Sequence, residues 1–252
     1  MSATRSGSVL ARARIAAMAT QTSSIAENLE RVRERVARAA ERVGRRADEI
    51  TIVAVSKTFP PDAIRAAHDA GLRHFGENRV QEFEDKHEKL SDLGDVVWHF
   101  IGHLQSNKAH RAVRLFDRID CVDSLSLAHK LEAAAATERK HLPVLIEVHL
   151  SREATKSGVA EKDLPELAAG LSQLPQLELR GLMTIPPYSD DPEAARPYFR
   201  KLRELRDNLR SASGLALPVL SMGMSHDFEV AIEEGATEIR VGTALFGART
   251  NA

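Results

Sequence analysis

From residue 50 onward, short apolar segments alternate with longer amphipathic segments, and this alternation restricts the possible folds more than any other feature of the chain. The pattern predicts strands at 50–56, 73–76, 96–101, 118–122, 143–150, 177–184, 217–222 and 237–242. It predicts helices at 61–70, 78–90, 106–115, 125–139, 162–173, 192–212 and 226–234, with Pro197 kinking or restarting the sixth. Eight alternating units indicate an α/β fold with a single closed (β/α)8 TIM barrel rather than an open sheet.

Before the barrel, the sequence predicts an additional helix. Ser24 and Glu27 have the spacing of a capping box, and Gly44 can end the helix in a left-handed conformation. Three further glycines, Gly71, Gly170 and Gly235, precede expected strands as helix stops. The apolar stripe that would cover one end or side of the barrel consists of Ile25, Leu29, Val32, Val36, Ala39, Ala40 and Val43.

The first 22 residues differ in composition from the rest. They contain arginines but no acidic residue, which is typical of an organellar transit peptide and equally of an over-long start, with Met18 as an internal alternative. We expect residues 1–22 to be a disordered extension without a targeting role. Residues 23–252 then form one domain, because no long linker interrupts them.

Composition limits the kinds of partner. With 35 basic and 36 acidic residues, the chain lacks the excess charge of a nucleic-acid-binding surface or of a protein drawn to anionic membranes. No apolar run reaches the roughly 18 residues of a membrane span. The single cysteine, Cys121, lies in a short strand pattern and fits a reducing compartment, so we expect a cytoplasmic protein.

Lys57 is the most informative single residue, because it ends the uncharged run from Thr51 to Ser56. A lysine at the end of a buried strand costs desolvation free energy unless it extends to water, forms an ion pair or reacts. Burial lowers the pKa of an amine and favours the neutral form that makes a Schiff base with an aldehyde. The alternative is a lysine whose stem packs on the rim while its ammonium reaches water.

The ends of the last two strands indicate an anion site. Ser221 and Thr243 offer hydroxyl donors, Gly223 and Gly242 permit close backbone approach, and Ser225 can cap the helix that begins near residue 226. Ordinary turn chemistry would explain the same residues. In a barrel the eighth strand closes beside the first, so this group lies next to Lys57. A ligand with both an aldehyde and a phosphate would suit the pair.

Six motifs resemble those of the YggS/PROSC-type pyridoxal phosphate homeostasis proteins over residues 24–249: VAVSKT, FGENRVQE, WHFIGHLQSNK, GLMTIPP, SMGMSHDFEVAI and IRVGTALFGAR. The resemblance implies the barrel of alanine-racemase-like proteins, with pyridoxal 5'-phosphate held on Lys57 as a Schiff base. It further implies that the remaining cofactor-binding residues are Asn78 near the ring, Ser221, Gly242 and Thr243 at the phosphate, Met222 and Gly223 shaping that cup, and Arg240 at the pyridine nitrogen.

Arg240 affects the expected chemistry. A carboxylate beside the pyridine nitrogen keeps it protonated and makes the ring a strong electron sink. An arginine can only donate a hydrogen bond, so carbanion chemistry would be poorly supported. The alternative is that Arg240 pairs with Glu77 or another acid at the rim.

Two positions depart from the family pattern, namely His149 and Arg79, and neither is the lysine or part of the phosphate motif. His226 lies at a variable position of the family's SMGMSxD pattern, in which Asp227 is kept. His99 and His103 could suggest a metal site. Four residues apart on a strand, they would share a face with too few partners, so we expect no metal.

The chain does not have the expected features of a racemase. Racemases of similar fold use a lysine and a tyrosine from an extra β-domain, and this sequence stops soon after the last strand. Of its two tyrosines, Tyr188 and Tyr198, the first lies near the correct end of the barrel and stays open as an acid or base. The leading hypothesis is a monomeric carrier or buffer that contacts apo cofactor-dependent enzymes transiently. A weak racemase is the alternative, and a Schiff-base aldolase without the cofactor is the third.

Overall fold

In the computed structural model, which describes residues 24–151 and 157–248, eight parallel strands close into a barrel. Strands β4 and β5 pair with each other and β1 pairs with β9, so the main sheet closes on itself. The short strand β6 (Val159–Ala160) pairs with the end of β5. The barrel strands are β1 (Thr51–Val55), β2 (His74–Glu77), β3 (Val97–Phe100), β4 (Arg118–Val122), β5 (Leu142–His149), β7 (Leu177–Met183), β8 (Val219–Met224) and β9 (Glu238–Val241). The expected (β/α)8 barrel is confirmed.

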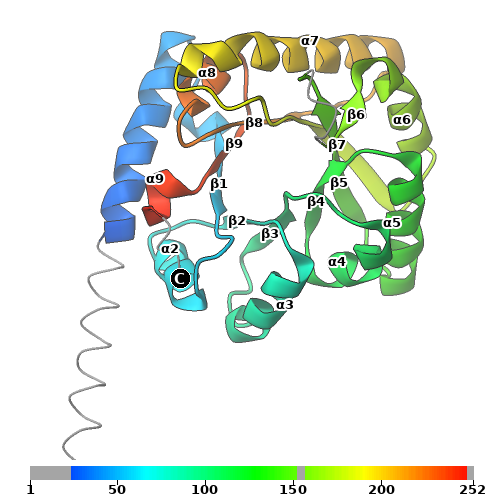
Figure 1. The fold of residues 1–252 in the computed structure, drawn as a ribbon, viewed down its shortest axis with the longest axis horizontal. Coiled ribbons are helices and arrows are strands. Elements are labelled where there is room, and N and C mark those ends of the chain that lie inside the picture. The colour runs from blue at the N-terminus through cyan, green and yellow to red at the C-terminus, as the bar shows by residue number, and fades with distance from the viewer. Residues whose placement is uncertain (1–23, 152–156, 249–252) are drawn as a thin grey trace, which may run out of the picture.

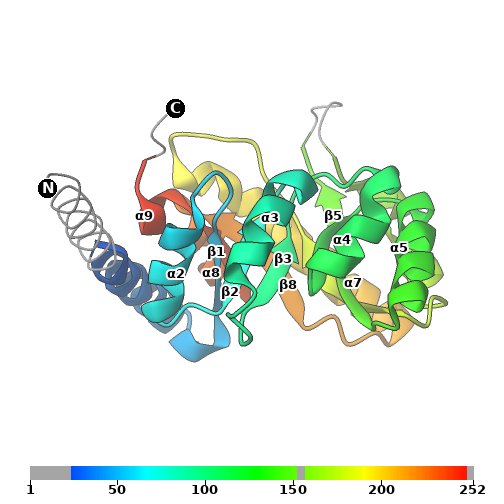
Figure 2. The ribbon, with the colours of Figure 1, turned by 90° about the horizontal axis from the view of Figure 1, so that it is seen from below.

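Helices surround the barrel on its outer side, as Figures 1 and 2 show. They are α2 (Pro61–Asp69), α3 (Val80–His87), α4 (Ala109–Leu115), α5 (Leu125–Glu138), α6 (Leu164–Leu171), α7 (Arg196–Ser213), α8 (Phe228–Glu233) and α9 (Thr243–Phe246). The expected helix at 192–212 is divided into a 3-10 turn, η5 (Pro192–Ala195), and α7, with Pro197 in the first turn of α7, where its missing N–H is tolerated. Within the described residues, no helix has both the length and the apolar character that crossing a membrane requires.

The N-terminal helix covers residues 24–42 of the described chain. Gly44 follows it with φ of 69°, as expected for a left-handed stop. Val43 was expected on the buried stripe, but it lies in the turn beyond the helix and is 41% exposed. The other stripe residues are all buried: Ile25, Leu29, Val32, Val36, Ala39 and Ala40. The expected extension at residues 1–22 lies outside the described residues.

This helix packs against α8 and α9 at one side of the barrel, as Figure 1 shows. Arg35 forms two hydrogen bonds with the Glu229 carboxylate, at 2.6 and 2.8 Å, and its guanidinium lies 4.3 Å from the centre of the Phe228 ring. Asn28 Nδ2 donates to the Leu245 carbonyl at 2.7 Å. The helix therefore supports the two short C-terminal helices from outside.

Two of the three predicted glycine stops are confirmed, since Gly71 and Gly235 have φ of 100° and 98°. The prediction for Gly170 was wrong, because this residue lies inside α6. Its role is close packing: a Cβ there would lie 2.3 Å from Leu125 Cδ2.

The amino-terminal half of the barrel interior contains a buried ionic network. Arg118 on β4 donates to Asp120 on the same strand at 2.5 and 2.8 Å, and to Glu238 on β9 at 2.6 and 2.7 Å. Because β4 and β9 are not neighbours in the sheet, the second contact crosses the interior. His99 Nδ1 lies 3.2 Å from Asp120 and its Nε2 lies 2.9 Å from His74 Nδ1. We call these five residues the lower network.

Candidate functional site

Lys57 lies in the turn after β1 rather than on the strand, and it is partly exposed instead of buried. The strand ends at Val55, which lines the barrel interior together with Val53. A Cβ atom added to Gly242 would lie 3.5 Å from Val55, and one added to Gly76 would lie 3.2 Å from Val53. Lys57 follows the carboxyl end of β1, two residues after Val55. The expected position at the barrel mouth is therefore confirmed, and the partial exposure of Lys57 is compatible with both interpretations of the sequence.

The turn that carries Lys57 is conformationally strained. Thr58 has φ of 69°, a left-handed conformation that a β-branched residue rarely adopts and that costs about 1–3 kcal/mol. The turn closes through a hydrogen bond from the Phe59 N–H to the Ser56 carbonyl at 3.0 Å. Phe59 also stacks on Phe246 of α9, with ring centres 4.7 Å apart. The lysine turn is therefore attached to the helix that begins at the expected phosphate cup.

A second group of charged side chains lies between the end of β2 and α3, and the sequence prediction missed it. Glu77 Oε1 accepts hydrogen bonds from Ser56 Oγ at 2.8 Å and from Lys86 Nζ at 3.0 Å. Lys86 also donates to Glu82, four residues earlier on α3, at 2.8 Å. Burial raises the pKa of Glu77, and Lys86 opposes that shift only in part. The four-residue spacing of Glu82 and Lys86 was the available sequence signal, but it does not reveal the third partner.

At the phosphate cup, two backbone amides converge on one oxygen. The N–H groups of Gly242 and Ala244 both donate to Ser225 Oγ, each at 3.2 Å. Ser225 was expected to cap the helix after it, but α8 begins after Asp227, and the Ser225 hydroxyl accepts its hydrogen bonds from the start of α9. Thr243 is the exposed first residue of α9. These amides are oriented as an anionic oxygen requires.

The three residues of the SMG motif have different environments. Ser221 is buried and its Oγ accepts a hydrogen bond from Arg240 at 2.9 Å. Met222 is fully buried in the hydrophobic core. Gly223 has φ of 92°, and a Cβ there would lie 2.6 Å from Ala231 Cβ on α8. Gly223 is therefore required for packing against α8, whatever its contact with a ligand.

Arg240 is buried in the barrel interior above the lower network. Its guanidinium donates to Ser221 Oγ and to the Thr184 carbonyl, at 2.9 and 2.8 Å. Within residues 24–151 and 157–248, no carboxylate forms an ion pair with it, and burial lowers its pKa. The alternative pairing with Glu77 is wrong, because that carboxylate is bound by Ser56 and Lys86.

Asn78 follows β2 at the barrel mouth and is partly buried. It packs directly on Gly102, where a Cβ would lie 2.5 Å from the Asn78 carbonyl oxygen. Close to the end of β5, Glu147 accepts a hydrogen bond from Ser157 at 3.2 Å, and burial raises its pKa. Arg79, one of the departures from the family pattern, is exposed at the start of α3.

The two histidines considered for a metal are separated in the structure. His103 lies beyond the end of β3 with a 61% exposed side chain, whereas His99 is part of the lower network. His99, Asp120 and Glu238 do offer ligand atoms within 4.8 Å of one another. However, Arg118 donates to both carboxylates and already supplies the positive charge that a metal would bring.

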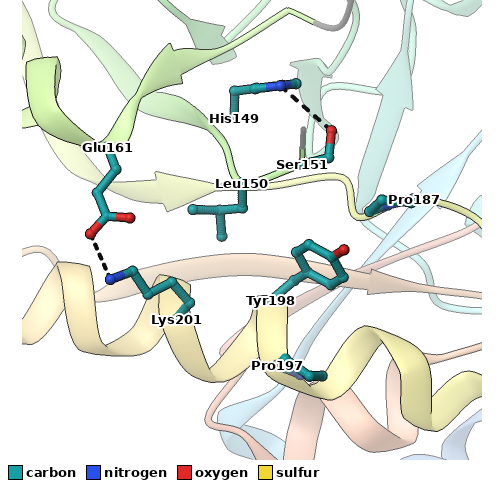
Figure 3. Close-up of a pocket in the computed structure, with 8 residues that line it drawn as sticks. All are labelled: His149, Leu150, Ser151, Glu161, Pro187, Pro197, Tyr198 and Lys201. Carbon is teal, nitrogen blue, oxygen red and sulfur yellow. Dashed lines mark hydrogen bonds and ion pairs between the residues drawn. The ribbon is translucent and has the colours of Figure 1, made fainter. Parts of the chain in front are cut away.

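A pocket of about 690 Å³ opens between the end of β5 and α7 (Figure 3). His149, Ser151 and Tyr198 line it, and a 2.5 Å ion pair joins Lys201 to Glu161 at its edge. Lys57 does not line it. We take the lysine turn rather than this pocket as the candidate site, because the convergent amides and the strained turn are there.

Tyr188, the residue left open as a second acid or base, is 79% exposed. Its hydroxyl donates to Asp190 at 3.0 Å, which raises its pKa. The ring centre of His226, which occupies a variable position of the family pattern, lies 6.0 Å from that of Tyr188. An exposed phenol with a raised pKa has none of the desolvation that tunes a catalytic base.

The residues at the mouth fit pyridoxal 5'-phosphate. The amides that meet at Ser225 would suit its phosphate, the buried Arg240 guanidinium would suit its ring nitrogen, and the Lys57 amine would suit its aldehyde. When bound, the cofactor would supply a reactive aldehyde on an electron-withdrawing ring.

Comparison with known proteins agrees with pyridoxal 5'-phosphate as the ligand. Residues 23–250 match the family model "Alanine racemase, N-terminal domain". The chain is 52% identical to a pyridoxal phosphate homeostasis protein of Aquifex aeolicus, over 79% of this chain and 86% of that protein. It is 48% identical to one of Pseudomonas aeruginosa, over 90% and 96%. The structure of PipY from Synechococcus elongatus, solved with pyridoxal phosphate bound, superposes with a TM-score of 0.79 at 42% identity, over 88% of this chain and all of that one. The chain therefore belongs to the alanine racemase N-terminal domain family, among its pyridoxal phosphate homeostasis proteins.

Proposed function

We propose that this protein holds pyridoxal 5'-phosphate as a Schiff base on Lys57 and stores, buffers or delivers it without catalytic turnover. The observation that carries the proposal is the convergence of the Gly242 and Ala244 amides on one oxygen beside the lysine turn. The stacking of Phe59 on Phe246 fixes the two parts of the site to each other. An aldehyde and a phosphate on one small molecule would engage both.

The donor at the ring nitrogen supports a carrier rather than an enzyme. Arg240 remains charged even with a lowered pKa, so it donates a hydrogen bond and supplies no proton to the ring. Carbanion chemistry at a bound amino acid would then lack its usual electron sink. The exposed Tyr188 also makes a poor second base.

Purified protein incubated with the cofactor should turn yellow and bleach with borohydride, and Lys57→Ala should abolish the colour. A colourless wild-type protein would contradict the Schiff base. A wild-type protein that stays colourless with the cofactor, but cleaves an aldol substrate without it and loses that activity in Lys57→Ala, would instead support the aldolase hypothesis.

Cofactor transfer tests the carrier role. Loaded protein should activate an apo pyridoxal phosphate enzyme, and the reductively trapped protein should not. For the racemase alternative, amino acids incubated in deuterated water should show no more α-proton exchange than free cofactor produces. Robust exchange that Tyr188→Phe abolishes would overturn the carrier proposal.

The proposal includes a cytoplasmic location, a monomeric state and transient contacts with apo enzymes. The one cysteine, Cys121, is buried, and burial raises its pKa, so it behaves as a packed apolar side chain in a reducing compartment. Light scattering of the purified chain tests the monomer, for which one mass near 27.7 kDa is expected.

A further inference from the structure

One acidic side chain and one lysine, both on α3, hold the backbone on both sides of Lys57. Lys86 Nζ donates to the carbonyl of Ser56, the residue before Lys57, at 3.2 Å. Glu82 Oε1 accepts the N–H of Thr58, the residue after it, at 2.6 Å. Helix α3 therefore fixes both peptide neighbours of Lys57 from outside the barrel.

These side chains form one connected unit, which we call the clamp: Glu77, Glu82 and Lys86. The Lys86 ammonium bridges the two carboxylates at 3.0 and 2.8 Å, and its side chain is only 10% exposed. The Ser56 hydroxyl adds a fifth contact, to Glu77. Charge-assisted hydrogen bonds that are shielded from water are strong and directional, so the clamp defines the geometry of the turn closely.

The clamp is more costly than the fold alone requires. Glu77 is fully buried, and within the described residues its Oε2 has no hydrogen-bond partner. Two carboxylates share a single ammonium, and apolar residues could fill such a layer at least as well. The turn that the clamp holds contains the left-handed Thr58. Unsatisfied polar atoms and backbone strain together are characteristic of functional sites.

We propose that Glu77, Glu82 and Lys86 act as positioning residues that hold Lys57 in the orientation needed to capture the cofactor's aldehyde. This inference rests on the proposed function. Without the clamp, Thr58 can relax to an ordinary conformation and Lys57 loses its fixed direction. Capture of the aldehyde then requires ordering of the turn, which weakens binding.

Two ligands separate positioning from general damage. Pyridoxal 5'-phosphate can react with Lys57, whereas pyridoxine 5'-phosphate has the same ring and phosphate but no aldehyde. The full chain and its variants Lys86→Met, Lys86→Arg and Glu82→Gln are titrated with both, by absorbance and by calorimetry. Lys89→Met is the matched control, because Lys89 is exposed one turn further along the same segment.

We expect Lys86→Met to weaken pyridoxal phosphate binding by about tenfold to a hundredfold, as loss of charge-assisted hydrogen bonds implies. Glu82→Gln should weaken it less, and Lys86→Arg should recover part of the loss. Binding of pyridoxine phosphate should stay unchanged in all of them. Glu82 is partly exposed, so Glu82→Gln keeps the test possible if Lys86→Met does not fold.

Equal weakening of both ligands in the clamp variants would overturn the inference, because it would show damage to the whole site. Unchanged pyridoxal phosphate binding in Glu82→Gln and Lys86→Met would also overturn it, while leaving Lys57 as the anchor. A wild-type protein without a Lys57-dependent absorbance change would instead refute the proposed function itself.

Discussion

The barrel interior contains two polar regions, and the buried arginine in each has different hydrogen-bond partners. In the lower network the Arg118 guanidinium faces two carboxylates, Asp120 and Glu238. At the mouth, the described hydrogen bonds of Arg240 and of the cup amides go to neutral oxygens, those of Ser221, Thr184 and Ser225. In the lower network the cation is bonded directly to carboxylates, whereas Arg240 interacts with nearby carboxylates, Glu147 and Asp227 among them, only over a longer distance. A buried charge is therefore informative about function only when its partners are considered.

The largest expected effect is in the lower network. Arg118→Met should lower the free energy of unfolding by about 3–5 kcal/mol, because it leaves two buried carboxylates without their cation. Urea denaturation measures the effect. The control is Arg111→Met, which removes a half-exposed pair with Glu84 and should cost less than about 1 kcal/mol. Similar losses of unfolding free energy in Arg118→Met and Arg111→Met would show that the lower network matters no more to stability than an ion pair at the surface.

Arg240→Met should affect ligand affinity more than stability. The loss of unfolding free energy should stay well below that of Arg118→Met, because its described hydrogen bonds go to neutral oxygens. Affinity for pyridoxal phosphate should fall by about tenfold to a hundredfold, since a charged donor to the ligand is lost. Arg240→Lys, which keeps the charge, should lose less. Equilibrium titration of the wild type, Arg240→Met and Arg240→Lys with pyridoxal phosphate measures the three affinities. Unchanged affinity in Arg240→Met would show that the ligand binds elsewhere.

The two regions should also respond to pH with opposite sign. Burial alone raises the pKa of Asp120, but Arg118 and His99 outweigh it, so the folded-state pKa lies well below its ordinary 3.8. Its stabilising contribution is present above 3.8 and is lost as the pH falls. Burial raises the pKa of Glu147 above 4.5, so its contribution is present below 4.5 and is lost as the pH rises through the folded-state value.

Comparison of the wild type with Asp120→Asn and Glu147→Gln tests these signs. From neutral pH down to about pH 3, the stability advantage of the wild type should shrink against Asp120→Asn and grow against Glu147→Gln. Denaturation curves at several pH values give both differences. Two differences that change in the same direction would contradict the account.

The smallest effect concerns the cup. Ser225→Ala removes the oxygen on which two amides meet, but solvent or ligand can replace it, so unfolding free energy should change by less than about 1 kcal/mol. Ser211→Ala on the exposed side of α7 is the control. A loss of several kcal/mol by calorimetry would show that Ser225 is a structural cap rather than part of a ligand site.

Much of this fold was predictable from local patterns. The buried strands have apolar sequences because helices cover them, and Pro197 marks the start of α7 correctly. The errors arose where one residue's role depends on a distant contact. Gly170 was read as a helix stop, but it is a packing position against Leu125. The short α9 was not predicted, because four residues carry too little periodicity.

The candidate site, like the fold, could be predicted from the sequence only in part. The position of Lys57 beside the last strand follows from barrel closure, which the sequence pattern predicts. Ser225 was correctly identified from the sequence, but it was expected to cap α8. Its hydroxyl instead accepts hydrogen bonds from amides at the start of α9. The clamp and the lower network could not be predicted, because Glu77 and Arg118 meet partners from other elements. Side-chain geometry between elements is not encoded in spacing along one segment.

The central claim is that Lys57, and no other lysine, receives the cofactor. Borohydride reduction of the loaded protein, followed by proteolysis and mass spectrometry, fixes the adduct and locates it. We predict one phosphopyridoxyl group, on the peptide that contains Lys57. Labelling mainly at another lysine, or no trapped adduct at all, would contradict the account.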